Sequence, residues 1–451
     1  MADEPMPQST RKSTQRARLI AGMIEVTNRR GYANANVSAV IGQAGVSRPT
    51  FYDYFEDRED CFRSAIADVQ LQLAGALDDA LDARGEESPH LVATRALVQF
   101  GGAEPARARF LMGEAMSGSG PALDVRDRGL AEMALAIDRA ENGADKQAVL
   151  ADFDARVLLG SVYRMVAARL RRGETTSVRL ADQLVEWARS YERPAQQRRW
   201  TKLRPQQTPG RSPHVPSVPI QQMPGVLPPG RPWIPPEEIA ENHRLRILYA
   251  SAKLAESKGA QASTVADIVK AARVDGRVFY RHFADKQEAF AAVHELGFQQ
   301  VMDVTAKAFF SVQGWPQRSW EAGRALTQLL EANPVVAHVG FVEAYAVGPG
   351  AVQRIEDSHA AFLFFLQEGL LQEQADPAPS RVAMEAIIAA VFELIYIAAR
   401  AAGKPRIAGM LPYFAHVWLT PFLGPDDADS FIDSQMPAKA KRARRPKARE
   451  A

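Results

Sequence analysis

The stretch GYANANVSAVIGQAGVSRPTFYDYFEDREDCF, from Gly31 to Phe62, occurs a second time as GAQASTVADIVKAARVDGRVFYRHFADKQEAF, from Gly259 to Phe290. The two copies align without a gap at an offset of 228 residues (259 minus 31). The chain therefore contains one module twice. Identical pairs at this offset include Val37 with Val265, Val46 with Val274, Phe51 with Phe279, Tyr52 with Tyr280, Phe55 with Phe283, Asp57 with Asp285 and Phe62 with Phe290.

Each copy predicts a helix, a sharp turn and a second short helix. In the first copy Asn36 is a good N-cap, and apolar residues follow at the i, i+3, i+4, i+7 spacing of one buried helical face. In the second copy Thr264 takes the N-cap position. The apolar faces consist of Val37, Val40, Ile41 and Ala44 in the first copy and of Val265, Ile268, Val269 and Ala272 in the second.

Gly45 can adopt the positive φ that a tight turn requires, and Ser47 can cap the helix that follows. Phe51 and Phe55 lie one turn apart on the inner side of that helix, which completes a helix-turn-helix. Because both rings are committed to the core, the other side chains point outward from a helix slim enough to enter a major groove. These outward residues are Arg48, Thr50, Tyr52, Asp53 and Tyr54.

This pattern resembles the TetR family of transcriptional regulators. The resemblance rests on AGVSRPTFYDYF (residues 44–55) and DREDCF (residues 57–62), after an amphipathic helix that ends at Gly31. It implies an all-α fold of two tandem TetR-like units, each a three-helix helix-turn-helix headpiece followed by a helical body for ligand binding and dimerisation. The second copy departs from the family pattern: Arg273 replaces the turn glycine, Asp275 the capping serine and Val278 the threonine.

The predicted DNA contacts come from both headpieces. In each copy a cation follows the N-cap aspartate of the next helix, Arg58 in the first and Lys286 in the second. A cation there opposes the helix dipole, so it indicates either an anion nearby or a solvated charge. The resemblance places it near the DNA backbone. The predicted contacts are Asn36, Ser47, Arg48, Thr50, Tyr52, Tyr54 and Arg58 in the first headpiece and Thr264, Gly276, Arg277, Tyr280, His282 and Lys286 in the second.

A chain of 451 residues exceeds what one hydrophobic core usually supports. Between the two units the composition shifts to proline, glutamine, arginine and serine, which predicts an extended linker. The lysines and arginines near the C-terminus predict a tail that is attracted to DNA of any sequence, with a tail that serves solubility as the alternative. The predicted order is a disordered arm at 1–14, a headpiece at 15–62, a body at 63–192, the linker at 193–236, a headpiece at 237–290, a body at 291–433 and the basic tail at 434–451.

Composition argues against several other classes of protein. A net charge of +2 is too small to indicate nucleic-acid binding by itself. Cys61 is the only cysteine, which excludes a disulfide within the chain and a cysteine-based zinc site. The most hydrophobic helix, at 386–399, is interrupted by Glu393, and the N-terminus lacks the apolar region of a signal peptide. We therefore expect a cytoplasmic protein with no membrane partner.

The sequence holds no recognisable catalytic motif. It contains no nucleotide-binding loop, dinucleotide fingerprint or zinc-protease motif, and GVSRP around Ser47 lacks the closing glycine of a nucleophile elbow. The histidines, among them His338, His359 and His416, lie at no spacing that defines a metal site. We predict no enzyme activity, no catalytic residue, no metal site and no cofactor.

The two helical bodies contain aromatic and methionine side chains at helical spacing. Such side chains usually form core. In a body that resembles the TetR family, however, some of them are expected to line a cavity for an apolar ligand. The predicted ligand-binding residues are Phe110, Met116 and Tyr163 in the first body and Phe341, Tyr345, Phe362, Phe392 and Tyr396 in the second.

The predicted function is that of a sequence-specific DNA-binding transcriptional regulator, a repressor released from a double-stranded DNA operator by a small apolar effector. The alternative is a helical ligand-binding or protein-interaction scaffold whose second headpiece is degenerate. The resemblance implies self-association through the C-terminal helices of the two halves, either within one chain as a pseudo-dimer or between chains as a homodimer. The candidate helices are 153–172, 178–191, 381–402 and 407–419.

Overall fold

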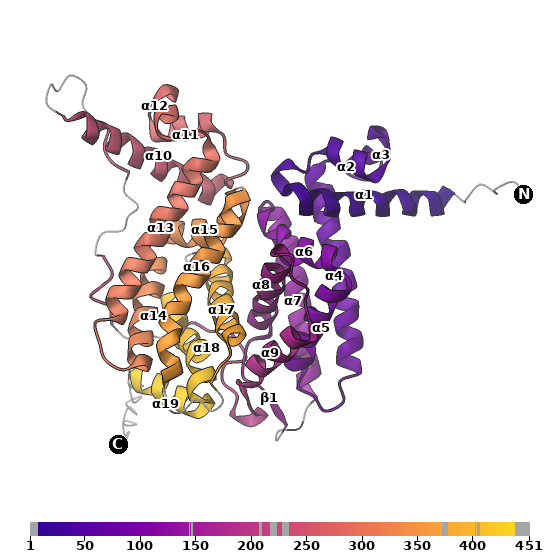
Figure 1. Cartoon of the computed structure of the whole chain (residues 1–451), viewed down its shortest axis with the longest axis vertical. Helices are drawn as coiled ribbons and strands as arrows, with labels where there is room; N and C mark the ends of the chain where they lie inside the picture. Colours follow the sequence, from indigo (N-terminus) through magenta and orange to yellow (C-terminus); the bar gives the residue numbers. More distant parts are fainter. Residues whose placement is uncertain are drawn as a thin grey trace, which may run out of the picture.

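A computed structural model of the chain (Figure 1) describes residues 8–143, 145, 148–206, 210–216, 223–227, 234–347, 349–371, 378–401, 403 and 406–437. The predicted all-α class is confirmed, because helices make up nearly all of its regular structure. The described residues hold one small sheet, in which β1 (Val149–Ala151) pairs antiparallel with β2 (Glu192–Pro194). Most of the predicted basic tail, from residue 438 on, lies outside the described residues.

The first headpiece consists of three helices and a 3-10 turn: α1 (Gln8–Arg30), η1 (Tyr32–Asn34), α2 (Val37–Ala44) and α3 (Arg48–Tyr52). The disordered arm predicted at 1–14 is corrected, because residues 8–14 belong to α1. These residues contain no glycine and no proline, so nothing in them interrupts the helix. Residues 1–7 lie outside the described part of the chain.

The second headpiece repeats this layout with α10 (Pro236–Lys258), α11 (Val265–Ala272) and α12 (Gly276–His282). Each headpiece continues into a long helix of its body, which is α4 (Arg58–Asp82) in the first half and α13 (Lys286–Phe309) in the second. The boundaries predicted after residues 62 and 290 therefore fall inside helices. A rigid helix thus connects each headpiece directly to its body.

The bodies are helical bundles. The first continues with α5 (Pro89–Ala103), α6 (Pro105–Met112), η2 (Glu114–Ser117), α7 (Gly120–Asn142), α8 (Ala155–Arg171), α9 (Val178–Arg189) and, after β2, η3 (Ala195–Gln197). The second continues with α14 (Trp315–Ala332), α15 (Pro334–Phe341), η4 (Glu343–Val347), α16 (Pro349–Gln367), η5 (Glu368–Leu371), α17 (Arg381–Arg400), η6 (Ala408–Met410), α18 (Leu411–Leu423) and α19 (Pro425–Gln435).

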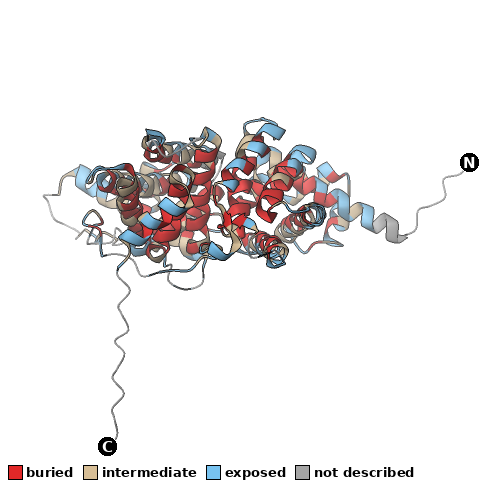
Figure 2. Cartoon of the chain, turned by 90° about the horizontal axis from the view of Figure 1, so that it is seen from below, coloured by how far each residue is buried: buried red, intermediate tan, exposed pale blue. Residues whose placement is uncertain are grey.

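The two halves lie side by side with both headpieces at the same end of the molecule (Figure 1). Helix α17 of the second half packs against α8 and α9 of the first. At the other end of this contact, the Tyr191 hydroxyl donates to the carbonyl of Val417 in α18 at 2.7 Å. One cluster of buried apolar side chains runs from the first body into the second, as the buried ribbon in Figure 2 illustrates.

A buried ionic cluster lies in the contact between α8 and α17. The Glu393 carboxylate of α17 is fully buried and accepts hydrogen bonds from Arg156 at 2.6 Å and Arg164 at 3.1 Å, both in α8. Gly160 lies between these arginines, and a Cβ atom there would overlap the carboxylate. Burial opposes ionisation, but the positive charges of Arg156, Arg164 and Arg126 outweigh it and lower the pKa of Glu393 to about 2.

The extended linker predicted at 193–236 is corrected in its first part, which packs against the second body. The buried Trp200 indole donates to Asp429 at 2.7 Å and stacks on His416, with ring centroids 5.2 Å apart. The Arg199 guanidinium pairs with Asp433 at 2.8 Å. Proline density prevents helix formation but does not prevent neighbouring aromatic and charged side chains from finding partners.

Among the described residues, α17 is the one helix long and apolar enough to cross a membrane. Its most apolar window is 78% buried within the fold. Because α17 packs against α8 and α9 and its Glu393 is paired with Arg156, we assign it as a core helix.

Candidate DNA interface and effector cavity

The first helix-turn-helix has the predicted cap and turn geometry. The Asn36 side chain accepts a hydrogen bond from the Ala39 N–H at 2.9 Å, and Gly45 is left-handed, with φ 61° and ψ 43°. Ser47 then caps α3 by accepting from the Thr50 N–H at 3.2 Å. Asn36 and Ser47, both predicted DNA contacts, therefore already serve to fix the two helices.

The segment that begins with the short helix α3 buries two rings and presents two side chains to solvent. Phe51 and Phe55 are buried, with ring centroids 5.6 Å apart. Arg48 is exposed, and Tyr52 is 51% exposed despite being aromatic. An exposed cation beside an exposed aromatic hydroxyl can bind phosphates and base edges.

Thr50 and Tyr54 are less available than predicted. The Thr50 hydroxyl is hydrogen-bonded to Ser47 at 2.8 Å, and the Tyr54 hydroxyl donates to Gln15 of α1 at 3.1 Å. The prediction that Tyr54 points outward is corrected: α3 ends at Tyr52, and the half-buried Tyr54 ring packs against the core. Tyr54 therefore holds the recognition segment against α1.

The cation predicted near the DNA backbone is bound inside each headpiece. The Arg58 guanidinium lies 4.4 Å from the centre of the Tyr32 ring and donates to the carbonyls of Tyr32 and Ala33 at 3.3 and 3.4 Å. The Lys286 ammonium donates to the corresponding loop. Backbone oxygens thus supply the negative partner that the pattern indicated, and both cations fix the loop before the second helix. The oxygens that Lys286 binds are those of Ala260, Gln261 and Ser263.

The second helix-turn-helix reaches the same geometry with other residues. Arg273 is left-handed, with φ 52° and ψ 48°, where the first copy has glycine. This conformation costs a side-chain-bearing residue about 1 to 2 kcal/mol. Thr264 and Asp267 form a reciprocal capping box for α11, and Asp275 caps α12 by accepting from the Arg277 N–H at 2.8 Å.

The surface of α12 is more basic than that of α3. Arg277 and Arg281 are both exposed, four residues apart on one helix, and Tyr280 is 62% exposed. Gly276 and His282, also predicted contacts, are half-buried. Two arginines beside a tyrosine are suited to both phosphate and guanine recognition.

The two segments with this geometry also match a known family. A family model described as bacterial regulatory proteins, tetR family, matches residues 19–65 and again residues 247–293. The chain carries the DNA-binding domain of the TetR family. The domain occurs twice, in tandem, which makes the protein a transcriptional regulator of the helix-turn-helix class.

A similar solved structure is that of a bacterial regulatory protein in the tetR family from Rhodococcus RHA1. Its sequence is 21% identical, the match covers 40% of this chain and 96% of that chain, and the TM-score is 0.34. No curated protein sequence matches the chain.

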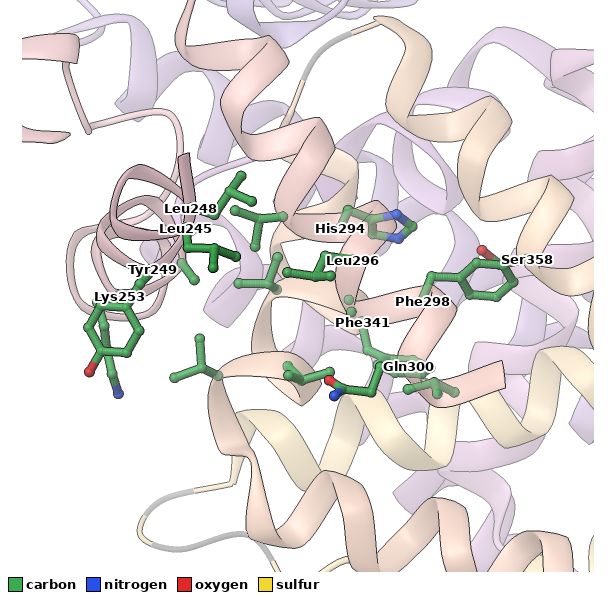
Figure 3. Close-up of a pocket in the computed structure, with 18 of the residues that line it drawn as sticks. Leu245, Leu248, Tyr249, Lys253, His294, Leu296, Phe298, Gln300, Phe341 and Ser358 are labelled. Atoms are coloured by element: carbon green, nitrogen blue, oxygen red, sulfur yellow. The ribbon is translucent and has the colours of Figure 1, made fainter. Parts of the chain in front are cut away.

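The second TetR unit contains a cavity of about 430 Å³ (Figure 3). It lies between the headpiece helix α10 and the body helices α13, α15, α16 and α17. Its volume is within the range of sites that hold drug-sized ligands. Most of the wall is apolar and includes Leu245, Leu248, Val293, Leu296, Phe298, Val301, Val335 and Val339.

Three of the predicted ligand-binding residues line this cavity: Phe341, Phe362 and Phe392. The prediction for the other five is corrected with respect to the cavity, because aromatic side chains at helical spacing form core as readily as cavity walls. They are Phe110 and Tyr163, buried in the core, and Met116, Tyr345 and Tyr396, which share a buried cluster formed by both halves.

Two glycines keep the cavity open. The offset of 228 pairs Gly297 with Val69, and an offset of 229 (334 minus 105) aligns α15 with α6 and pairs Gly340 with Leu111. Val69 and Leu111 are fully buried in the first unit. In the second unit a Cβ atom on Gly340 would meet nothing within 4 Å, and one on Gly297 would meet only Val336, at 3.4 Å. Comparison of the two copies could therefore have located the cavity from the sequence.

Proposed function

We propose that this TetR-family protein is a sequence-specific repressor whose two units bind one operator as an intramolecular pseudo-dimer. A small apolar ligand in the cavity releases it. The observation that carries the proposal is the placement of α3 and α12 at one end of the molecule, with the bodies joined behind them (Figure 1). Two-fold helix-turn-helix dimers present their recognition helices in this way, about one DNA turn apart.

Pairing within one chain is supported by the charges in the contact. Glu393 lies in α17, whereas Arg156 and Arg164 lie in α8. Pairing of α17 with a second α17 brings two buried carboxylates together, and pairing of α8 with a second α8 gathers four arginines, so both arrangements are disfavoured. The tether adds an effective concentration in the millimolar range.

The unlike recognition helices imply an operator with unlike halves. Selection of binding sites from random DNA is expected to give two different half-sites about one helical turn apart, because Arg48 and Tyr52 face one half while Arg277, Tyr280 and Arg281 face the other. The mass of the free protein in solution is expected to be that of a single chain. A palindromic consensus together with a dimer of the full chain would overturn this proposal.

Alanine substitution is expected to identify the base-reading side chains. Arg48→Ala or Tyr52→Ala should weaken operator binding by about 1 to 3 kcal/mol where the side chain reads a base, and Arg277→Ala or Tyr280→Ala should do the same at the other half-site. Operator titrations with and without competitor DNA measure the loss and its selectivity. Lys307→Ala removes an exposed cation from α13 in the second body and serves as the control. Unchanged affinity in all four headpiece variants would contradict the assignment.

Release by a ligand is supported by the position of the cavity. Its wall combines α10 of the second headpiece with four helices of the body, so an occupant touches both parts at once. A ligand shifts a conformational equilibrium only when it binds the two arrangements with different affinity. An occupant that contacts both α10 and the body can bind one placement of α10 more tightly than another, which provides such a difference.

A further inference from the structure

The cavity contains a buried polar atom without a partner. His294 of α13 is 8% exposed and lines the cavity, and its Nδ1 atom has no hydrogen-bond partner in the described part of the chain. At the offset of 228, the first unit has the fully buried Ile66 at this position. A buried polar atom without a partner is costly. Its presence where the other copy is apolar points to a ligand that supplies the partner.

The imidazole is neutral near pH 7. Burial, together with the nearby Arg354 cation, lowers the pKa of His294 to about 4, against a smaller opposing effect of Glu295. A neutral ring nitrogen donates or accepts one hydrogen bond, depending on the tautomer. The neighbouring Ser358 hydroxyl already donates to the Arg354 carbonyl at 2.8 Å, and it can still accept. This end of the cavity therefore offers neutral hydrogen-bonding groups.

The polar groups are unevenly distributed along the cavity. Figure 3 shows Tyr249 and Lys253 at one end, with their polar atoms directed away from the cavity, and His294, Phe298 and Ser358 at the opposite end. Apolar side chains line the space between them. Such a wall favours an apolar body. It penalises a buried carboxylate, because Lys253, the cation among the described lining residues, is paired with Glu256 at 2.9 Å, and the nearby Arg354 does not line the cavity.

We propose that the cavity binds an elongated, uncharged apolar molecule with one hydroxyl or carbonyl group, which hydrogen-bonds to Nδ1 of His294. This inference rests on the proposed effector function of the cavity and names the chemical class of the effector. Because the wall includes α10, the bound molecule contacts the second headpiece directly. The first headpiece has no part in this wall.

The test is a binding measurement with three ten-carbon probes: 1-decanol, n-decane and decanoate. Each probe displaces the fluorescent apolar dye N-phenyl-1-naphthylamine from the purified full chain. The variant His294→Ile introduces the residue that the first unit has at this position. It is expected to lose about tenfold in affinity for 1-decanol, the value of one hydrogen bond in a buried site, with no loss for n-decane. Decanoate is expected to bind the unmodified protein at least tenfold more weakly than 1-decanol.

A second variant tests the location. Gly340→Leu introduces the residue of the first unit into open space, so it is expected to abolish binding of both 1-decanol and n-decane. An unchanged thermal unfolding curve shows that this variant is folded. Unaltered binding in Gly340→Leu, an equal loss for both uncharged probes in His294→Ile, or tighter binding of decanoate than of 1-decanol would each overturn the inference.

The readout is free of DNA, so this inference and the proposed release mechanism fail separately. Loss of the expected probe selectivity overturns the ligand class. Normal selectivity combined with unchanged operator affinity in saturating 1-decanol retains the ligand class and counts against release.

Discussion

Glu393→Gln is expected to lower the free energy of unfolding by about 3 to 5 kcal/mol, because removing one partner of a buried ion pair leaves uncompensated charge in the core. Glu393 is fully buried, and Arg156 and Arg164 point at it from α8. Glutamine keeps the shape but not the charge, so Arg164 loses its ion-pair partner and Arg156 keeps only Asp127, at 3.3 Å. Urea denaturation, followed by the fluorescence of the buried Trp187 and Trp200, measures the loss.

The control is a second ion pair in the same contact. Arg169 of α8 and Glu385 of α17 lie 2.7 Å apart, but both are partly solvated, at 17% and 21% exposure. Glu385→Gln is therefore expected to cost at most about 1 kcal/mol. Similar losses in both variants would show that burial of the charge at Glu393 is not the cause.

A triple variant separates charge from packing. Replacing Glu393, Arg156 and Arg164 together with leucine or methionine removes the carboxylate and its two hydrogen-bonded partners, while Arg126 keeps its pair with Asp127 at 3.1 Å. Apolar replacement of buried, paired charges is often neutral or stabilising, so this variant is expected to recover most of the stability that Glu393→Gln loses. The variant also lacks the like charges that disfavour pairing of α8 with a second α8 or of α17 with a second α17. We therefore expect it to dimerise at high concentration.

The protein is expected to lose stability steeply as the pH falls from about 6.5 towards 4. Burial lowers the pKa of His294 to about 4 and that of His359 and His416 to about 3, from an unfolded value of 6.5. Below pH 6.5 the unfolded chain binds protons that the folded chain does not, so each histidine contributes a loss of about 1.4 kcal/mol per pH unit. Burial raises the pKa of Asp152 to about 6, which opposes part of this loss.

His416→Gln isolates one of these contributions. Both nitrogens of the neutral His416 ring are hydrogen-bonded. Nε2 lies 2.7 Å from the Asp152 carbonyl oxygen, and Nδ1 lies 3.1 Å from the Thr420 hydroxyl. Glutamine can hydrogen-bond but does not titrate, so the stability curve between pH 6 and 4 should flatten by about 1.4 kcal/mol per pH unit. An unchanged slope in His416→Gln would contradict this origin of the acid sensitivity.

The headpieces could be predicted from the sequence because their determinants are local. Asn36, Gly45 and Ser47 act on backbone groups within a few residues, and the duplicated pattern around Phe51 and Phe279 supports the same assignment twice. The sequence also contains the differences between Val69 and Gly297 and between Leu111 and Gly340. They indicate a cavity only after the two copies are aligned position by position, beyond the stretch in which their sequences agree.

The contact between the halves could not be predicted in the same way. Glu393 is recognisable in the sequence only as a charge that interrupts an apolar helix. Its partners Arg156 and Arg164 lie in the other half of the chain, and no periodicity connects them to it. The stacking of Trp200 on His416 was also not predictable from the sequence. Proline content indicates the backbone conformation of the linker but not the partners of its side chains. Tyr54 differs from its prediction because α3 ends two residues before it.

The covalent joining of the two units affects how the regulator responds to its own abundance. In a regulator that assembles from separate subunits, operator occupancy at low expression follows the square of the subunit concentration, because dissociation competes with binding. Under the proposed pairing within one chain, the two units have no such assembly step. Operator occupancy then follows the first power of the amount of protein, so halving the copy number at cell division lowers occupancy in proportion and not more steeply.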